Sequence, residues 1–446
     1  MSNKHHFLKV GFSRLHSDNN FKYINTGLAS KPVEQQTHGQ ADAWHWVGDY
    51  AAKLDAKNQI SFHSWLQRTE REVPSGMISA ASDAVQTDAA QRFLVEWKRQ
   101  SKQGVLRFTQ AHLLEQFTYK DPSKWIDSRY EAESSISKIH YRHFVKNITW
   151  DIGWQQTKNQ VANNYYVHIP KEDLGAFFTA VQIKEAQWKG VLSIRKETHP
   201  LYAVPLIPSL GLDFKLLPTV LGKLALSKNF KAPAFNDLYW MGGFAHGNPD
   251  LLPETAQSFE CGLDWEQKQS NLSITLHSTQ LDDMIKWTPV EGGVWIPQNL
   301  LEVWARGLEL QGATEAQIGL LKVRLAASYS FTQSTLEKSA LVNDAAIDQQ
   351  LMYVPKDKAS AILHLDYQQW SCMTTASYTG EVNTTSDGLR TLDAYELFDV
   401  QLKYRSKTAP INISWQVRNL LDKTYQVYEW YPTPGRNYMI TISITI

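Results

Sequence analysis

The sequence contains only two cysteines, Cys261 and Cys372, among its 446 residues. Two cysteines are too few for a disulfide framework, and these two lack the C-x-x-C spacing of a zinc site. Long hydrophobic runs are also lacking: the best apolar stretch, 174–181, is far shorter than the roughly 18 residues that a transmembrane helix requires. A helical membrane protein is therefore excluded. A membrane β-barrel is not excluded, because apolar and polar residues alternate along its strands and no long apolar run is needed.

The chain also has no excess of positive or negative charge. The chain has 45 Lys and Arg against 45 Asp and Glu, so its formal net charge is zero. This balance gives no electrostatic reason to expect nucleic acid as a partner. The first ten residues, MSNKHHFLKV, have neither the apolar core nor the cleavage site of a signal peptide. Nucleotide-binding and nucleophile motifs do not occur in the settings they need, so we expect no enzyme activity, no cofactor and no metal site.

The sequence does contain many aromatic residues, 16 Trp, 19 Tyr and 17 Phe, and long stretches of period-two alternation. Segments 322–331, 398–405, 411–417 and 437–446 all alternate between apolar and polar side chains. Successive side chains of a strand point to opposite faces, so each segment has one apolar and one polar face. The pattern predicts about twenty strands, with at most a short helix in a loop.

The connections between the predicted strands alternate in length. Short polar turns, such as 100–104 and 315–317, come between long links, such as 286–299 and 419–435. In an up-and-down meander every second connection lies at the same end of the sheet. The short turns therefore lie at one end and the long links at the other. Segment 301–317 is also longer than an ordinary globular strand of roughly 5–6 residues. We therefore predict an all-β fold: a large antiparallel up-and-down transmembrane β-barrel with a wet, polar lumen.

Two blocks of sequence carry a family resemblance. Residues 226–240 read LSKNFKAPAFNDLYW and are followed by GNPDLLPE at 247–254 and SFECGL at 258–263. Near the end, the chain reads NLLDKTY at 419–425 and YPTPGRNY at 431–438. These blocks resemble the barrel signature of TonB-dependent outer-membrane receptors, and most closely that of the vitamin B12 and siderophore receptors. We interpret the matching residues as structural: Phe230, Pro233, Leu238, Tyr239, Asn248, Pro249, Pro253, Glu254, Glu260, Asn419, Tyr425, Pro434, Gly435 and Arg436.

The resemblance implies that residues 1–446 form the β-barrel domain of such a receptor, with about 20 of the 22 strands of the family barrel. We recognise no signal peptide, TonB box, plug domain or first hairpin, so we expect an N-terminally truncated domain. The resemblance implies that the full-length protein imports a scarce bulky nutrient, cobalamin or a ferric siderophore, across the cell outer membrane. Its implied partners are outer-membrane lipid, the TonB complex and that small-molecule ligand; whether a surface lipoprotein caps the loops is left open.

Ligand capture in such receptors uses outer-loop and upper-lumen side chains, and aromatic rings suit a large planar ligand. The candidate ligand contacts are aromatic residues in or beside the outer links: Trp240, Trp287, Trp295, Tyr378 and Trp430. Two alternative functions stay open on the sequence. One is a passive pore or a non-functional truncated barrel. The other is a soluble, Trp-rich β-protein that binds carbohydrate.

Overall fold

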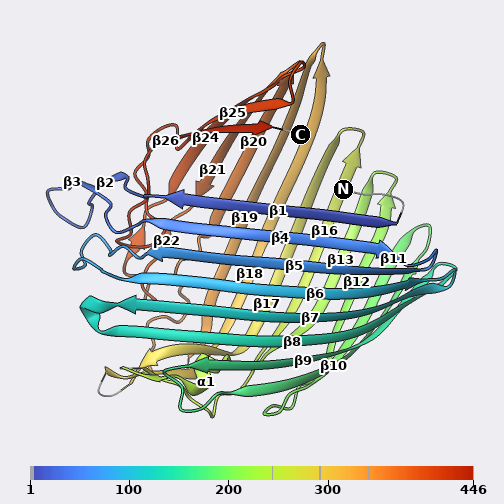
Figure 1. Ribbon diagram of the computed structural model, residues 1–446, viewed down its shortest axis with the longest axis horizontal. Helices are drawn as coiled ribbons and strands as arrows, with labels where there is room; N and C mark the ends of the chain where they lie inside the picture. Colours follow the sequence, from blue (N-terminus) through green and yellow to red (C-terminus); the bar gives the residue numbers. More distant parts are fainter. Residues whose placement is uncertain (1–4, 244, 291–292, 340–341, 445–446) are drawn as a thin grey trace.

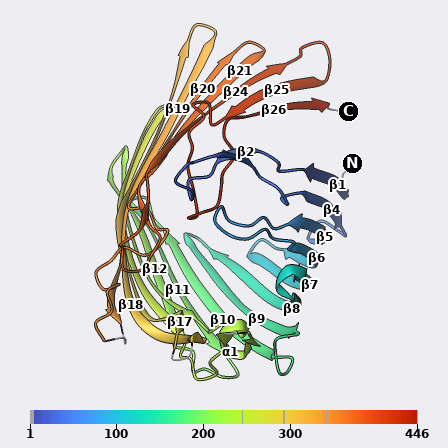
Figure 2. The ribbon, with the colours of Figure 1, turned by 90° about the vertical axis from the view of Figure 1, so that its left-hand side faces the viewer.

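The computed structural model describes residues 5–243, 245–290, 293–339 and 342–444. Its main sheet has 22 strands in these ranges. Two of them, β14 (Met241–Gly242) and β15 (Ala245–His246), are two-residue pieces of one loop, which leaves 20 strands for the wall. The wall strands curl around a lumen (Figures 1 and 2). The predicted all-β fold and the predicted count of about twenty strands are confirmed.

Each wall strand pairs antiparallel with the next wall strand along the chain. The first ten are β1 (His6–Ser17), β4 (Ala41–Lys53), β5 (Asn58–Glu72), β6 (Val85–Gln100), β7 (Gly104–Asp121), β8 (Ile126–Val145), β9 (Ile148–Asn163), β10 (Lys171–Lys184), β11 (Trp188–Thr198) and β12 (Ile207–Leu217). The other ten are β13 (Val220–Lys231), β16 (Glu254–Gln267), β17 (Ser270–Pro289), β18 (Trp295–Ile318), β19 (Leu321–Ser339), β20 (Asp357–Tyr367), β21 (Trp370–Thr379), β24 (Tyr395–Arg405), β25 (Ile411–Arg418) and β26 (Asn437–Ile444).

The loops carry the remaining elements. These are two small hairpins and two short helices: β2 (Lys22–Ile24) with β3 (Val33–Gln35), β22 (Val382–Asn383) with β23 (Thr391–Leu392), the 3-10 helix η1 (Pro122–Lys124) and the α-helix α1 (Phe235–Tyr239). The expected short helix in a loop is thus confirmed. In the part of the chain that the structure describes, no helix has the length and apolar character needed to cross a membrane.

The short turns gather at one end of the barrel, the turn end, and the long links at the other, the loop end (Figure 1). Tight turns place Lys268, Gly319 and Gln368 in the left-handed region, with φ between +52° and +60°, as two-residue hairpin loops require. Two predicted boundaries are wrong. The turn expected at 315–317 lies at 319–320, because β18 and β19 pair as far as Ile318 and Leu321. The link expected at 286–299 is mostly strand, because β17 and β18 continue to pair within it as far as Pro289 and Trp295.

The two faces of the wall differ in chemistry. On one face apolar side chains stand opposite one another across neighbouring strands, as Tyr50 does with Phe62. On the other face charged side chains pair, as Asp49 does with His63, whose Nδ1 lies 2.7 Å from Asp49 Oδ1. A membrane barrel faces lipid outside and water inside, so the charged face is the luminal one. The predicted polar lumen therefore follows the alternation of the sequence.

The ring of wall strands is interrupted at one seam. β1 and β26 hold the two edges of the sheet, and Figure 2 shows them apart, with the N and C ends of the chain on either side of the gap. Within the described ranges, no backbone pairing joins β1 to β26. β1 runs toward the loop end and β26 runs away from it, so the two edges are antiparallel. An even number of added strands would keep the alternation of a closed barrel.

Candidate ligand-binding site

The loop end is built around α1, in the first of the two signature blocks. The chain leaves β13 at Lys231 and turns into α1, where the backbone N–H of Ala234 donates a 3.0 Å hydrogen bond to Asp237 Oδ2. The other carboxylate oxygen of Asp237 accepts a 2.9 Å hydrogen bond from Trp287 Nε1 on β17. One carboxylate therefore satisfies the helix N-terminus and also fixes a tryptophan from a distant strand.

Glu254 and Asn248 hold the loop that follows α1. Glu254 is only 7% exposed; its Oε2 lies 2.6 Å from Lys231 Nζ, and its Oε1 accepts a 2.9 Å bond from the backbone N–H of Ile285. Asn248 Nδ2 donates to the Pro297 carbonyl oxygen at 3.1 Å. These contacts connect β13, β16, β17 and β18 at the loop end of the barrel. The first signature block therefore fixes the positions of these loops relative to one another.

The second signature block shapes the long loop between β25 and β26. Asn419 is 5% exposed, has φ of +50°, and donates its backbone N–H to Asp399 Oδ1 at 2.8 Å. The backbone N–H of Arg436 donates to Asp422 Oδ1 at 2.7 Å. A Cβ on Gly435 would lie 2.6 Å from that same oxygen, so the close approach requires glycine there.

Three of the five predicted ligand contacts lie around α1. The Trp240 ring stacks on Tyr165 with centroids 4.8 Å apart. Trp287, on β17, donates a hydrogen bond from its Nε1 to Asp237 of α1. Trp295 is 47% exposed and begins β18 beside the short strand β15. The structure thus gathers aromatic surface at the loop end, on segments that are far apart in the sequence.

The other two predicted contacts lie elsewhere. Tyr378 is on β21, where its register partners Ala359 and Glu396 share the outward face of the wall. Trp430 belongs to the loop between β25 and β26, and its carbonyl oxygen accepts a 2.7 Å hydrogen bond from the Met77 N–H. Neither joins the group around α1 through a contact that the structure describes. All five residues stay predicted ligand contacts.

A pocket of about 580 Å³ opens beside α1, within the usual range for small-molecule sites. Its polar lining includes Glu115, Glu172, Glu197, His199 and Tyr166, and no Lys or Arg is among its lining residues. These side chains come from β7, β10, β11 and two loops. The sequence alone gave no signal for them, because neighbouring strands, not neighbouring residues, bring them together.

The electrostatics of this pocket are set by burial. The His199 side chain is 8% exposed, and its Nε2 lies 3.5 Å from Glu172 Oε2. Burial lowers the pKa of His199, although the nearby Glu172 partly opposes the shift. Burial also raises the pKa of Tyr166, which contacts Asn236 of α1 through its hydroxyl. Two of the three glutamates are ion-paired with arginines that do not line the pocket, Glu115 with Arg92 and Glu197 with Arg195. At neutral pH the pocket therefore offers carboxylate oxygens, a neutral imidazole and a phenol but no lining cation, which suits a neutral ligand that donates hydrogen bonds.

Comparison with known proteins decides the family. Residues 9–420 match the family model described as TonB dependent receptor-like, beta-barrel. The chain belongs to the TonB-dependent receptors. It is an outer-membrane β-barrel of a family of transporters, not an enzyme, and no plug domain lies among the residues that the structure describes. Membership favours the barrel over the soluble carbohydrate-binding alternative.

Among curated relatives, the chain is similar to proteins named vitamin B12 transporter BtuB. The one from Photobacterium profundum is 27% identical over 327 residues, which cover 69% of this chain and 51% of the relative. The one from Vibrio vulnificus strain YJ016 is 27% identical over 325 residues, covering 70% of this chain and 50% of the relative. The chain thus spans about half the length of the curated relatives it matches.

Solved structures show the same fold at lower identity. The copper transporter OprC matches with a TM-score of 0.78 at 12% identity, covering 99% of this chain and 76% of OprC. The ferric yersiniabactin uptake receptor FyuA from Yersinia pestis matches with a TM-score of 0.76 at 13% identity, covering 99% of this chain and 74% of FyuA. At such identities the likeness supports the barrel fold alone.

Proposed function

We propose that residues 1–446 form the barrel domain of a receptor that takes up a bulky nutrient across the outer membrane, with cobalamin as its ligand. Transport by the whole protein would be driven through the TonB complex. The two sequence relatives described above support cobalamin, because each is named a vitamin B12 transporter. A ferric siderophore is the other ligand that the sequence resemblance implied.

The observation that carries the choice is the lining of the pocket beside α1. Cobalamin is a large neutral corrinoid rimmed with amide groups, whose N–H donors can bind carboxylates such as Glu172 and Glu197. A ferric catecholate siderophore is strongly anionic. It would meet the Glu172 carboxylate and no lining Lys or Arg, because the charges of Glu115 and Glu197 are already balanced by Arg92 and Arg195. Aromatic surface from Trp240 and Tyr165 adds the planar contact that a corrin ring suits.

Equilibrium binding to the chain refolded in detergent tests this proposal. Cyanocobalamin should quench tryptophan fluorescence saturably, and ferric enterobactin should not. Glu172→Gln with Glu197→Gln should weaken cyanocobalamin binding about tenfold, because each loses a charge-assisted acceptor. The matched control Glu131→Gln removes a carboxylate that does not line this pocket and should change binding less than twofold. Tighter binding of the ferric siderophore than of cyanocobalamin would overturn the choice of ligand.

A second measurement separates the receptor from the passive-pore alternative. The refolded chain should be placed in a planar bilayer, with and without cyanocobalamin. Steady ion conductance that cyanocobalamin leaves unchanged, together with no fluorescence response, would favour a passive pore. Conductance that falls as cyanocobalamin binds would support a ligand site over the lumen.

A further inference from the structure

A groove crosses the outward face of the wall between β11 and β18; we call it the outer groove. It has a volume of about 670 Å³, within the usual range for small-molecule sites. Four of its apolar side chains are at least 40% exposed, so the groove presents apolar surface on the outside of the barrel. Its apolar lining comes from neighbouring strands: Leu192, Pro208, Leu210, Leu226, Phe259 and Trp304.

The register of the sheet places the outer groove opposite the luminal charges. Lys223 of β13 forms an ion pair with Asp264 on the charged, luminal face. Leu226 lies three residues further along the same strand, so its side chain points to the other face. Its register partners Leu210 and Phe259 share that outward face. A molecule in the outer groove would therefore contact membrane lipid rather than the lumen.

A row of polar side chains borders the outer groove on its loop-end side. Lys228 is the register partner of Gln257, and Gln257 is the register partner of Gln280. Lys228 lies two residues nearer the loop end than Leu226, and Gln257 lies two residues nearer it than Phe259. The outer groove thus has an apolar part toward the middle of the wall and a polar part toward the loop end.

Lys228 brings the positive charge to this polar part. It is the one charged residue among those that line the outer groove, and it is half-buried. Among the described residues Lys228 makes no ion pair, and the side-chain amides of Gln257 and Gln280 make no hydrogen bond there. A partly desolvated cation without a counter-charge is unfavourable. The outer groove is therefore suited to a ligand that brings an anionic group to Lys228.

Trp304 closes the outer groove on the β18 side. Its Nε1 donates a 2.8 Å hydrogen bond to Ser278 Oγ, and the Arg306 guanidinium carbon lies 3.7 Å from the centroid of its ring. Arg306 has a carboxylate of its own, since its Nη1 lies 3.5 Å from Glu337 Oε1. The tryptophan ring is thus held in place as an apolar side of the groove, and the charge of Arg306 is balanced.

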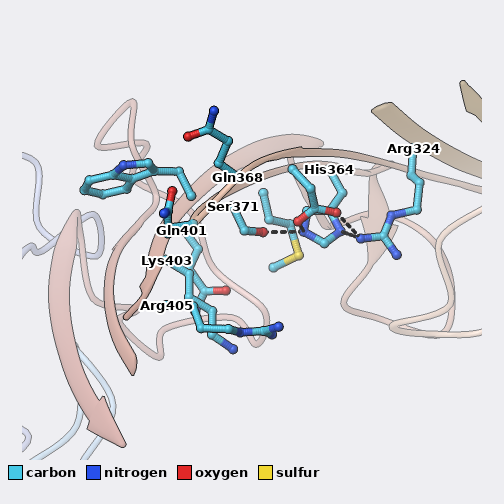
Figure 3. Close-up of a pocket in the computed structure, with 11 residues that line it drawn as sticks. Arg324, His364, Gln368, Ser371, Gln401, Lys403 and Arg405 are labelled. Atoms are coloured by element: carbon cyan, nitrogen blue, oxygen red, sulfur yellow. Dashed lines mark hydrogen bonds and ion pairs between the residues drawn. The ribbon is translucent and has the colours of Figure 1, made fainter. Parts of the chain in front are cut away.

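Two other pockets of the wall contain paired charges of both signs. In the luminal pocket shown in Figure 3, Arg324 Nη2 lies 2.7 Å from His364 Nδ1 and also contacts the carboxylate of Asp366. In the pocket lined from β8, β9 and β10, Lys158 Nζ lies 3.8 Å from Asp173 Oδ2. The outer groove differs from both, because it combines apolar surface with one unpaired cation.

We propose that the outer groove binds an anionic membrane phospholipid, with its phosphate beside Lys228 and its acyl chains along Leu226 and Phe259. The groove faces the bilayer, so a lipid reaches it without leaving the membrane. Its polar row lies on the loop-end side of its apolar part, in the same order as the headgroup and acyl chains of a lipid. Gln257 and Gln280 can donate hydrogen bonds to phosphate or ester oxygens. The inference does not depend on the nutrient ligand proposed above.

Lipid titration followed by native mass spectrometry tests the proposal on the full chain in detergent. The probes are phosphatidylglycerol and phosphatidylcholine with identical acyl chains, so that they differ in net charge. Wild type should bind phosphatidylglycerol at least about fivefold more tightly, as one lysine near an anionic headgroup provides. Lys228→Gln should reduce this preference to less than about twofold. The control Lys158→Gln removes an outward lysine that is already paired with Asp173, and it should keep the wild-type preference.

Two further variants separate charge, apolar contact and fold. Lys228→Arg keeps the charge and should keep the preference within about twofold of wild type. Leu226→Ser with Phe259→Ser should weaken the binding of both lipids by a similar factor, because acyl contact is lost while Lys228 stays. Each variant should retain the wild-type difference in gel mobility between heated and unheated samples. Equal affinity of wild type for the two lipids would overturn the proposal, and so would phosphatidylglycerol binding that the Leu226 and Phe259 changes leave intact.

Discussion

The backbone N–H of Met77 donates a 2.7 Å hydrogen bond to the carbonyl oxygen of Trp430, across the seam where the sheet begins and ends. Gln426 Nε2 donates to Thr26 Oγ1 at 2.6 Å in the same cluster. The loops after β1, after β5 and before β26 are therefore joined, although the edges of β1 and β26 are unpaired. At the loop end, side chains and loop backbone hold the two ends of the wall together.

Gln426→Ala should weaken this connection. The change removes the bond to Thr26 and the 2.8 Å acceptor for the Trp430 N–H, so we expect a loss of about 1–2 kcal/mol in the free energy of unfolding. Urea unfolding in detergent would measure it. Gln317→Ala, which removes one bond to the Gly319 carbonyl oxygen at the turn end, is the control and should cost less. Equal losses for the two variants would mean that the seam cluster has no special role.

Asp237→Ala tests the double use of one carboxylate at α1. The variant removes the acceptor for the Ala234 N–H and the acceptor for Trp287 Nε1. We expect a loss of about 1–3 kcal/mol, with a red-shifted tryptophan emission as Trp287 loses its fixed position. Trp287→Phe removes only the second bond, so its cost should be smaller than that of Asp237→Ala. A larger cost for Trp287→Phe would show that ring packing, not the carboxylate, holds this loop.

The alternation of the sequence predicts the wall best where the strand crosses lipid. β26 follows the alternating isoleucines of 437–446, and its predicted position is confirmed. The prediction fails where β17 and β18 continue into the loop end, because Pro289, Gly293 and Pro297 are residues typical of turns and the apolar residues there no longer alternate with polar ones. β17 and β18 show this, since Trp287 and Pro297 are register partners in a region that the sequence assigned to a link.

The candidate sites were harder to predict for a different reason. Glu172, Glu197 and His199 reach one pocket because β10 and β11 are neighbours in the wall. The Met77–Trp430 contact joins loops from opposite ends of the chain. Such contacts depend on strand register and on closure of the wall, and neither can be read from local spacing. The signature blocks did mark the loops, because their turn residues determine local backbone conformation.

Acidification should destabilise the loop end through His199. Burial lowers the pKa of this imidazole below its ordinary value of 6.5 in the folded state. As the pH falls below about 6.5, the unfolded chain takes up this proton first, so folding stability decreases until the folded pKa is reached. His199→Gln should therefore lose less stability than wild type between about pH 7 and pH 5. Unfolding midpoints at several pH values would measure this, and parallel curves would assign the effect to other groups.

The order of three substitutions around Glu254 tests why the 247–254 segment of the first signature block ends in a glutamate. Glu254 is nearly buried, whereas the Lys231 side chain is 71% exposed, so the charge pair itself is partly screened and contributes little. The bond from the Ile285 N–H to Glu254 Oε1 is part-buried, and an unsatisfied donor there is costly. Glu254→Ala should thus cost about 2–4 kcal/mol, Glu254→Gln about 1 kcal/mol because an amide oxygen still accepts, and Lys231→Met less than about 1 kcal/mol. Unfolding free energies from urea titration would rank them. If Lys231→Met instead costs as much as Glu254→Ala, the ion pair rather than the backbone hydrogen bond is what the glutamate supplies.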